Sequence, residues 1–309
     1  MIRLPADRPV PAPSRGAVVA LGNFDGFHLG HQAVVGRAIE RASAEGRPAM
    51  VVTFDPHPAR LFKPDAPPFL LTTIPQRMDL FEEFGADSAL ALPFDRDMAA
   101  ESPEIFVREW LHDRLGAAAI VTGGDFTFGK DRAGDTDALA RLAAHHGMHA
   151  ETVAAVEAEG AVASSTRVRQ HLKAGEMEAA ARLLTRPFAI RGGVQHGDKL
   201  GRTIGFPTAN LLLGDYLRPA YGIYAVRGRL EDGRALDGAA NLGIRPHFDP
   251  PKELLEPHFF DFSGDLYGQT ITVELIARLR GEEVFDSLEA LTAQIEADCE
   301  EARRILRAA

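Results

Sequence analysis

Apolar residues in the first half of the chain form short continuous runs that alternate with stretches of helical spacing. The runs read AVVALGNF, AMVVTFDP, SALALPF and AAIVTGGDF, and the helical stretches include HQAVVGRAIERASAEG, SPEIFVREWLHDRL and TDALARLAAHHG. Buried strands that alternate with amphipathic helices are typical of a parallel sheet covered by helices on both faces. The pattern therefore predicts a doubly wound α/β domain, which we place at residues 14–184.

The pattern changes near residue 185, where short apolar stretches are interrupted by Gly, Pro and Asp. In QTITVELIARLR, residues 269–280, apolar side chains occupy every second position, as in a strand with one buried face. Several such strands at close spacing favour a small antiparallel β-barrel, at residues 185–309. Ser287 is a suitable N-cap for a C-terminal helix over LEALTAQIEADCEEARRIL. The strand face expected to be buried consists of Ile271, Val273, Leu275, Ala277 and Leu279.

The net charge of the chain bears on whether the protein binds nucleic acid. The 309 residues carry a formal net charge of −10. Nucleic-acid binding gains affinity from clustered basic side chains, so an acidic chain without a long Lys/Arg run argues against a dedicated DNA or RNA binder. A nucleotide substrate is still compatible, because a metal ion and a few local cations can neutralise its phosphates.

The chain also lacks signals for an oxidising or membrane location. Its one cysteine, Cys299, cannot form an internal disulfide. The N-terminal MIRLPADRPVPAPSRG has no continuous apolar core like that of a signal peptide, and no run approaches the ~20 apolar residues that span a membrane. We therefore expect a cytoplasmic protein without membrane contact, whose oligomeric state the sequence leaves open.

Candidate chemistry gathers where the predicted parallel strands end. ALGNFDGFHLGH, TFDPHP and GGDFTFGKDRAGD each follow an apolar run, and ligands of such sheets bind beyond the carboxyl ends of the strands. In the first motif, glycines and two histidines, His28 and His31, precede a helix. A helix N-terminus binds phosphate, and histidines there can donate to its oxygens. Taken alone, two surface histidines beside a helix cap explain this motif equally well.

Two further motifs strengthen a nucleotide interpretation. SSTRVR, residues 164–169, places hydroxyls and arginines ahead of the helical HLKAGEMEAAARLL, as in an anion site. Alone, it would be better explained as a Ser/Thr cap with surface arginines; together with the histidine motif it suggests nucleotidyl transfer. In GGDFTFG, Phe126 and Phe128 lie beside Asp125 and could hold a planar ring, although one phenylalanine could equally fill the core.

These motifs resemble a known family. GNFDGFHLGH, TFDPHP, GGDFTFGKDRAG and SSTRVR are similar, in order and spacing, to the adenylyltransferase module of the bacterial bifunctional riboflavin kinase/FMN adenylyltransferases. The resemblance implies that five residues stabilise an ATP triphosphate and its developing charge: His28, His31, Ser165, Thr166 and Arg169. It also implies ATP contacts at Gly22, Asn23 and Gly30, and flavin contacts at Asp25, Asp125, Phe126 and Phe128.

The second half resembles the riboflavin kinase module of the same family, through GRTIGFPTAN, YGIYAV, NLGIRP, LEPHFFDF, DLYG and FDSL. Thr208 and Asn210 are two residues apart, which places both on one face of a strand. Turn chemistry is the ordinary explanation of such a pair, but the resemblance implies that it holds ATP-bound magnesium, an ion that prefers oxygen ligands. The resemblance further implies ATP contacts at Gly197, Lys199, Gly201, Gly205 and Pro207.

The resemblance also implies a base and a flavin contact in this half. Glu256 would accept the proton of the ribityl hydroxyl, although a strand glutamate is more often only solvent-facing. Arg280 would lie near flavin or phosphate, with a salt bridge as the alternative. Three residues depart from the family pattern: Phe27, His247 and Pro257. Proline within a strand places the local geometry beside Glu256 in question.

The expected function is therefore flavin cofactor biosynthesis. ATP would phosphorylate riboflavin to FMN in the second domain, and the first domain would transfer AMP from a second ATP to FMN, giving FAD and pyrophosphate. One alternative is that a single domain is active and the other only binds flavin or regulates. Another is RNA binding, since HxGH signatures and small barrels also occur in RNA-binding enzymes, but the net charge of −10 disfavours it.

Overall fold

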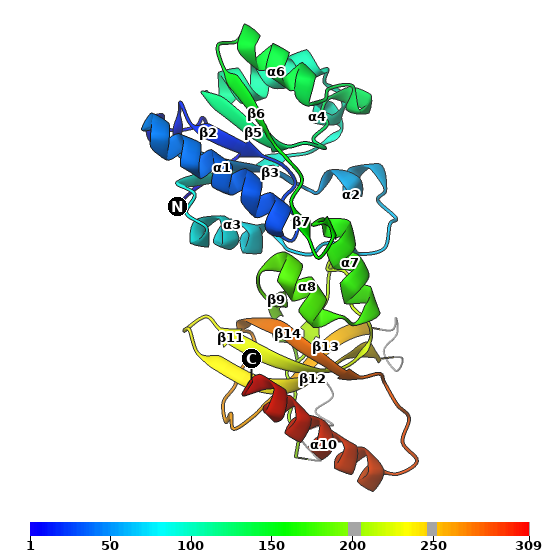
Figure 1. Ribbon diagram of the computed structural model, residues 1–309. Helices are drawn as coiled ribbons and strands as arrows, with labels where there is room; N and C mark the ends of the chain where they lie inside the picture. The colour runs from blue at the N-terminus through cyan, green and yellow to red at the C-terminus, as the bar shows by residue number, and fades with distance from the viewer. Residues whose placement is uncertain (197–204, 246–251, 309) are drawn as a thin grey trace. The chain divides into compact units, whose positions relative to one another are not determined.

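The structure is a computed structural model that describes residues 1–196, 205–245 and 252–308. Internal contacts divide the chain into two units (Figure 1). Unit 1 comprises Met1–Ala66 and Thr73–Ser164, and unit 2 comprises Pro67–Thr72 and Ser165–Ala309. Four residues singled out in the sequence lie outside the described residues: Gly197, Lys199, Gly201 and His247.

Unit 1 is built on a six-stranded parallel sheet with the strand order β1-β4-β3-β2-β5-β6. Its six strands are β1 (Ile2–Leu4), β2 (Val18–Leu21), β3 (Ala49–Asp55), β4 (Ser88–Pro93), β5 (Ala119–Gly123) and β6 (His149–Val153). The four central strands, β2 to β5, coincide with the apolar runs of the sequence.

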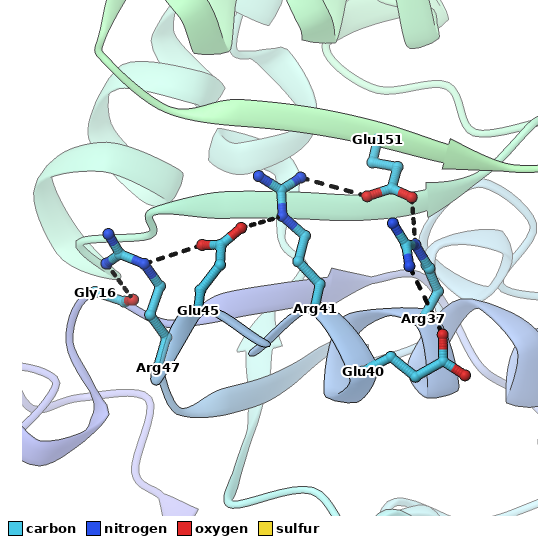
Figure 2. Close-up of polar contacts among 7 residues, drawn as sticks. All are labelled: Gly16, Arg37, Glu40, Arg41, Glu45, Arg47 and Glu151. Atoms are coloured by element: carbon cyan, nitrogen blue, oxygen red, sulfur yellow. Dashed lines mark hydrogen bonds and ion pairs between the residues drawn. The ribbon is translucent and has the colours of Figure 1, made fainter. Parts of the chain in front are cut away.

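Helices cover both faces of this sheet, as predicted. Successive residues of β2 point to opposite sides: Val18 packs in the core with α1 (Leu29–Glu45) and α3 (Ile74–Glu83), and Val19 in the core with η2 (Phe106–Arg114) and α6 (Thr136–His145). On the solvent side, ion pairs tie α1 to the edge strand β6, because Glu151 accepts hydrogen bonds from Arg37 and from Arg41 (Figure 2). The short elements of this unit are η1 (Ala12–Ser14), α2 (Pro58–Phe62), α4 (Arg96–Ala100), α5 (Pro103–Ile105), η3 (Lys130–Arg132), β7 (Glu157–Ala158) and β8 (Ala161–Val162).

The strand order fixes where a ligand can bind in unit 1. From β2 the chain proceeds to β3 and β4 on one side of the sheet, and then returns to β5 and β6 on the other. The switch point therefore lies between β2 and β5, and ligands of open α/β sheets bind at such a point, beyond the carboxyl ends of the strands. The HxGH motif follows β2, and the GGDFTFG motif follows β5.

Unit 2 contains an antiparallel sheet of six strands in the order β10-β13-β12-β11-β14-β9. A bridge between Gln195 and Asn210 joins the chain after β9 to the start of β10, so the barrel is nearly closed, as predicted. Its elements are α7 (Ser165–Ala174), α8 (Met177–Leu184), β9 (Phe188–Gly193), β10 (Leu211–Leu212), β11 (Gly222–Leu230), β12 (Ala235–Arg245), β13 (Lys252–Phe259), β14 (Thr270–Arg280) and α10 (Leu288–Leu306).

The local predictions for the barrel are confirmed. Along β14 the predicted apolar positions are buried from Ile271 to Ala277, and Leu279 is half-buried. The Ser287 hydroxyl accepts a hydrogen bond from the amide of Ala290 at 3.1 Å, which makes it the N-cap of α10. Helix α10 packs on alanines of the sheet, including Ala225.

Three local features differ from the sequence prediction. Strands β1 and β6 have no continuous apolar run, because they are the edge strands and β6 is largely polar. The single helix expected after Arg169 is two helices: α7 begins earlier, at Ser165, and ends at Gly175, whose φ of +81° is the left-handed conformation that stops a helix. Residues Phe106–Arg114 form a π-helix.

Candidate active sites

The two histidines of the HxGH motif form a stacked pair at the start of α1. His28 is the N-cap, and its Nδ1 accepts the amide of Gly30 at 3.1 Å. The rings of His28 and His31 stack with centroids 3.7 Å apart. Because Nδ1 of His28 is an acceptor, Nε2 carries the proton of the neutral ring. The pair therefore places imidazole N–H donors beside the helix N-terminus, where a phosphate is favoured.

Close packing favours glycine at position 30. A Cβ atom there would lie 3.1 Å from Cε1 of His28 and 3.3 Å from the carbonyl oxygen of Ala163. Gly22, which directly follows β2, has a similar constraint, because a Cβ would lie 3.1 Å from the ring of Phe24. The glycines of the motif thus allow the loop and the histidine pair to pack closely.

A buried arginine, Arg77 of α3, holds the loop that precedes the histidines. Its guanidinium lies 3.6 Å from a carboxylate oxygen of Asp25, and both side chains are at most 2% exposed. It also donates to the carbonyl of Asn23 at 3.1 Å, and Thr53 donates to the same oxygen at 2.8 Å. Asp25, which the resemblance implied as a flavin contact, is here the buried partner of Arg77, whereas the side chain of Asn23 is exposed.

Phe27, one of the departures from the family pattern, belongs to an aromatic cluster. Its ring meets those of Phe81 and Phe84 edge-to-face, with centroids 5.3 Å apart in each case. Phe24 also contacts Phe81, at 5.7 Å. Both Phe24 and Phe27 have positive φ, a conformation that costs about 1–3 kcal/mol for a non-glycine residue and therefore needs such packing.

The three residues of the GGDFTFG motif differ in their surroundings. Phe128 is 7% exposed and packs on Phe106 in the core, which is the alternative that the sequence left open. Phe126 is half-buried and stacks on Phe128 with centroids 5.7 Å apart, and Asp125 is exposed. Of these three residues, Asp125 and Phe126 are therefore the accessible ones.

The SSTRVR motif begins with Ser164, the last residue of unit 1, but from Ser165 onward it belongs to unit 2 and forms the first turns of α7. Ser165 and Thr166 are the first two residues of this helix. Arg169 donates from Nε to the carbonyl of Phe69 at 2.9 Å, and its guanidinium lies 5.6 Å from the centroid of the Phe69 ring. Segment 67–72 is tied to this unit also by Leu70, whose amide donates to the carbonyl of Asp215 at 3.0 Å.

In the barrel, strand register brings two of the implied kinase residues to one sheet face. In β10 and β13, Leu211 lies opposite Leu255, and the amide of Ala209 donates to the carbonyl of Pro257 at 2.9 Å, which continues that register by two pairs before Leu211. Asn210 therefore lies opposite Glu256. Directly opposite residues share a face. Thr208 lies two residues before Asn210, in the segment that precedes β10.

The other side of β13 adds partners for the implied base. Asn241 of β12 lies opposite Glu256, and the Glu256 carboxylate forms an ion pair with Arg245. The Asn241 amide is within hydrogen-bonding distance of both groups. The side chain of Glu256 is only 15% exposed. Sequence reasoning missed Asn241 and Arg245, because only the β12–β13 register places them beside the carboxylate.

Pro257 does not distort this strand. The register between β12 and β13 runs without a break from Gly238–Phe259 to Arg245–Lys252. In antiparallel sheets the N–H and C=O of one residue face the same neighbour. Because the carbonyl of Pro257 bonds Ala209, the N–H that proline lacks would have faced the end of β10 and not β12.

A pocket of the barrel is lined by Pro207, Thr208 and Ala209, together with Pro257 and other residues, but not by Asn210, Glu256 or Asn241. Thr208 and Asn210 offer a hydroxyl and an amide oxygen, which suit a magnesium ion that keeps phosphate and water ligands. Among the residues that the structure describes, no group of three or more His, Cys, Asp or Glu could hold a metal by itself. The donor set thus fits magnesium brought by a nucleotide.

Arg280, implied as a flavin contact, forms a salt bridge, the alternative that the sequence left open. Its Nη2 and Nε lie 2.7 and 2.9 Å from the two carboxylate oxygens of Asp298 on α10. These hydrogen bonds raise the pKa of Arg280 above its ordinary value. The arginine thereby joins β14 to the C-terminal helix.

The α/β unit has a stacked histidine pair at the start of the helix that follows β2, and the barrel gathers carboxylate and amide side chains on one sheet face; both features suit a two-domain transferase that uses ATP. The FAD synthetase family model matches residues 10–167, and the riboflavin kinase family model matches residues 184–306. The chain belongs to the family of bifunctional riboflavin kinase/FMN adenylyltransferases.

Individual relatives cover nearly the whole chain. The bifunctional riboflavin kinase/FMN adenylyltransferase of Pseudomonas fluorescens is 42% identical, over 94% of this chain and 93% of its own length. That of Escherichia coli (strain K12) is 39% identical, over 93% and 92%. A crystal structure described as a macrolide-efflux protein from Streptococcus pneumoniae is 32% identical, covers 98% of this chain and 99% of its own, and has a TM-score of 0.87.

Within residues 1–196, 205–245 and 252–308, none of the helices combines the length and the apolar character needed to cross a bilayer.

Proposed function

We propose that this chain catalyses two successive reactions of flavin cofactor synthesis. In the barrel unit, the terminal ribityl hydroxyl of riboflavin attacks the γ-phosphorus of ATP, and the bond to the β-phosphate oxygen breaks, giving FMN and ADP. In the α/β unit, a phosphate oxygen of FMN attacks the α-phosphorus of a second ATP, giving FAD and pyrophosphate. The observation that carries the proposal is the presence of both family domains in one chain.

In the kinase reaction, Glu256 accepts the proton of the attacking hydroxyl. The support is its position beside Asn210 and Asn241 and its ion pair with Arg245, which orients the carboxylate. Thr208 and Asn210 would hold the magnesium ion, which, when bound, neutralises charge on the phosphates of ATP. Gly205 and Pro207 contact ATP in this proposal, together with Gly197, Lys199 and Gly201.

In the adenylyl transfer, no covalent enzyme intermediate is needed, and catalysis is positioning and electrostatic stabilisation. His28 and His31 of the α/β unit donate hydrogen bonds to the triphosphate. Ser165, Thr166 and Arg169, in the first turns of α7, are further phosphate-binding residues in this proposal. Gly22, Asn23 and Gly30 allow the nucleotide to approach the start of α1. Asp125 and Phe126 contact the flavin from the end of β5, and Phe128 supports the ring of Phe126.

The partners in this proposal are small molecules only: ATP, riboflavin and FMN. The cytoplasm is the location that suits these substrates. We propose no nucleic-acid or membrane partner, in keeping with the net charge of −10.

The test is chromatography of riboflavin incubated with purified protein, ATP and magnesium over time. FMN that appears first and is then converted to FAD supports both activities. FMN that accumulates without FAD contradicts the proposed activity of the HxGH unit, and FAD formed from added FMN but not from riboflavin contradicts that of the barrel. Chelation of magnesium is expected to stop FMN formation.

A further inference from the structure

The side chain of His258 bonds the segment that carries Thr208. His258 lies on β13, two residues after Glu256 and on the same face. Its Nδ1 is 2.8 Å from the carbonyl oxygen of Pro207. On the other side of Thr208, the amide of Ala209 donates to the carbonyl of Pro257 at 2.9 Å. Residues on both sides of Thr208 are therefore bound to the strand that carries the proposed base.

We propose that His258 is a positioning residue for ATP in the kinase reaction. It holds the Pro207–Thr208 segment at the pocket edge, in register with Glu256. The inference rests on the proposed kinase function and extends it to a residue that touches no reacting atom. Supporting hydrogen bonds of this kind hold a ligand-binding group in place. In metal sites, loss of such a supporting contact lowers metal affinity or activity about 10–100-fold.

The contact fixes the protonation of the imidazole. A carbonyl oxygen can only accept a hydrogen bond, so Nδ1 of His258 must carry a proton. The neutral ring is then the Nδ1–H tautomer. The tautomer gives a spectroscopic signature that does not depend on enzyme activity.

Ring packing is the competing explanation of this histidine. The ring of His258 lies edge-on to Phe206, with centroids 5.4 Å apart, and at 6.0 Å from Phe260. Two substitutions separate the roles. His258→Phe keeps an aromatic ring but removes the donor, whereas His258→Asn removes the ring but keeps an N–H near the position of Nδ1.

The first experiment measures the steady-state kinetics of FMN formation by the full-length variants, with FAD formation from added FMN as the control for an intact fold. We expect His258→Phe to raise the KM for ATP about tenfold or more, with the KM for riboflavin and the FAD-forming step unchanged. We expect His258→Asn to restore a KM for ATP close to that of the wild type. Two variants that both match the wild type, or a His258→Asn that is as impaired as His258→Phe, would overturn the inference.

The second measurement is ¹⁵N NMR of the histidine rings in the wild-type protein above the pKa range of histidine, near pH 8. The His258 signals are identified by their absence from the spectrum of a variant. A protonated Nδ1 supports the inference, and an Nε2–H tautomer with bare Nδ1 overturns it. Because this measurement needs no catalysis, it tests the contact even if wild-type protein forms no FMN, a result that would contradict the proposed function instead.

Discussion

The two candidate sites are assembled in different ways. In the α/β unit, the histidine pair and the glycines that admit it come from one short segment after β2, and a buried arginine from another helix holds the loop. In the barrel, Asn210, Glu256 and Asn241 come from three neighbouring strands and meet only because those strands pair in one register. The first site is thus a local sequence motif held by Arg77, which is distant in the sequence, and the second is assembled by strand pairing.

This difference determines what substitutions should do. A site made by one loop depends on the contacts that hold that loop, so loss of Arg77 should disturb the whole histidine site. A site made by strand register is held by the whole ladder, so individual side chains there can be changed with less effect on the fold.

The largest stability effect is expected for Arg77→Met. The substitution leaves the carboxylate of Asp25 buried without its ion-pair partner, which typically costs about 3–5 kcal/mol. Denaturant unfolding should show that loss, and FAD formation from FMN should fall with it. The double variant Arg77→Met/Asp25→Asn, which removes both charges, should recover part of the stability. A single variant as stable as the wild type would contradict the role of Arg77 as the support of this loop.

An intermediate effect is expected for Asp298→Asn in the barrel unit. Weakening the bonds to Arg280 should cost about 2 kcal/mol, the scale of hydrogen bonds to a charged group. The KM for riboflavin should change little, because Arg280 is here a structural partner of α10. The matched control is Glu300→Gln, an exposed position on the same helix. A large rise in the KM for riboflavin without loss of stability would restore the flavin contact implied by the sequence.

The smallest effect is expected for Glu151→Gln, in the ion pairs of Figure 2. The partners Arg37 and Arg41 have side chains 46% and 18% exposed, and pairs of this kind contribute about 0.2–1 kcal/mol. The loss in unfolding free energy should shrink further at high salt, because surface charges are screened. The control is Glu83→Gln, an exposed glutamate of α3. A loss above about 2 kcal/mol would show that edge strand β6 depends on these pairs, contrary to the usual weakness of surface ion pairs.

The sequence predicted what depends on local pattern. The alternation along β14, the Ser287 cap and the strand–helix order of the first half are local features, and all are confirmed. The edge strand β6 was missed because a strand exposed at the sheet edge needs no apolar run. The break at Gly175 was missed because a glycine within a helical pattern does not by itself reveal a left-handed conformation.

For the candidate sites too, the sequence predicts local motifs but not contacts between residues that are far apart in the chain. The histidine motif marked its position in the sequence, because a helix start with glycines is a local signal. Arg77 could not be predicted, since an arginine within a helix is usually on the surface and only the packing of α3 buries it. Asp25 and Arg280 have charged partners far along the chain, so their ion pairs appear only in the folded protein.

The most direct test of two independent sites is a reciprocal assay of Glu256→Gln and His31→Gln. Each variant is measured for FMN formation from riboflavin and for FAD formation from added FMN, with Glu231→Gln as an exposed control. Glu256→Gln should lose about 10²–10⁴-fold in FMN formation and keep FAD formation. His31→Gln should lose about 10²–10³-fold in FAD formation and keep FMN formation. Loss of both activities in either variant, or of neither, would contradict the account.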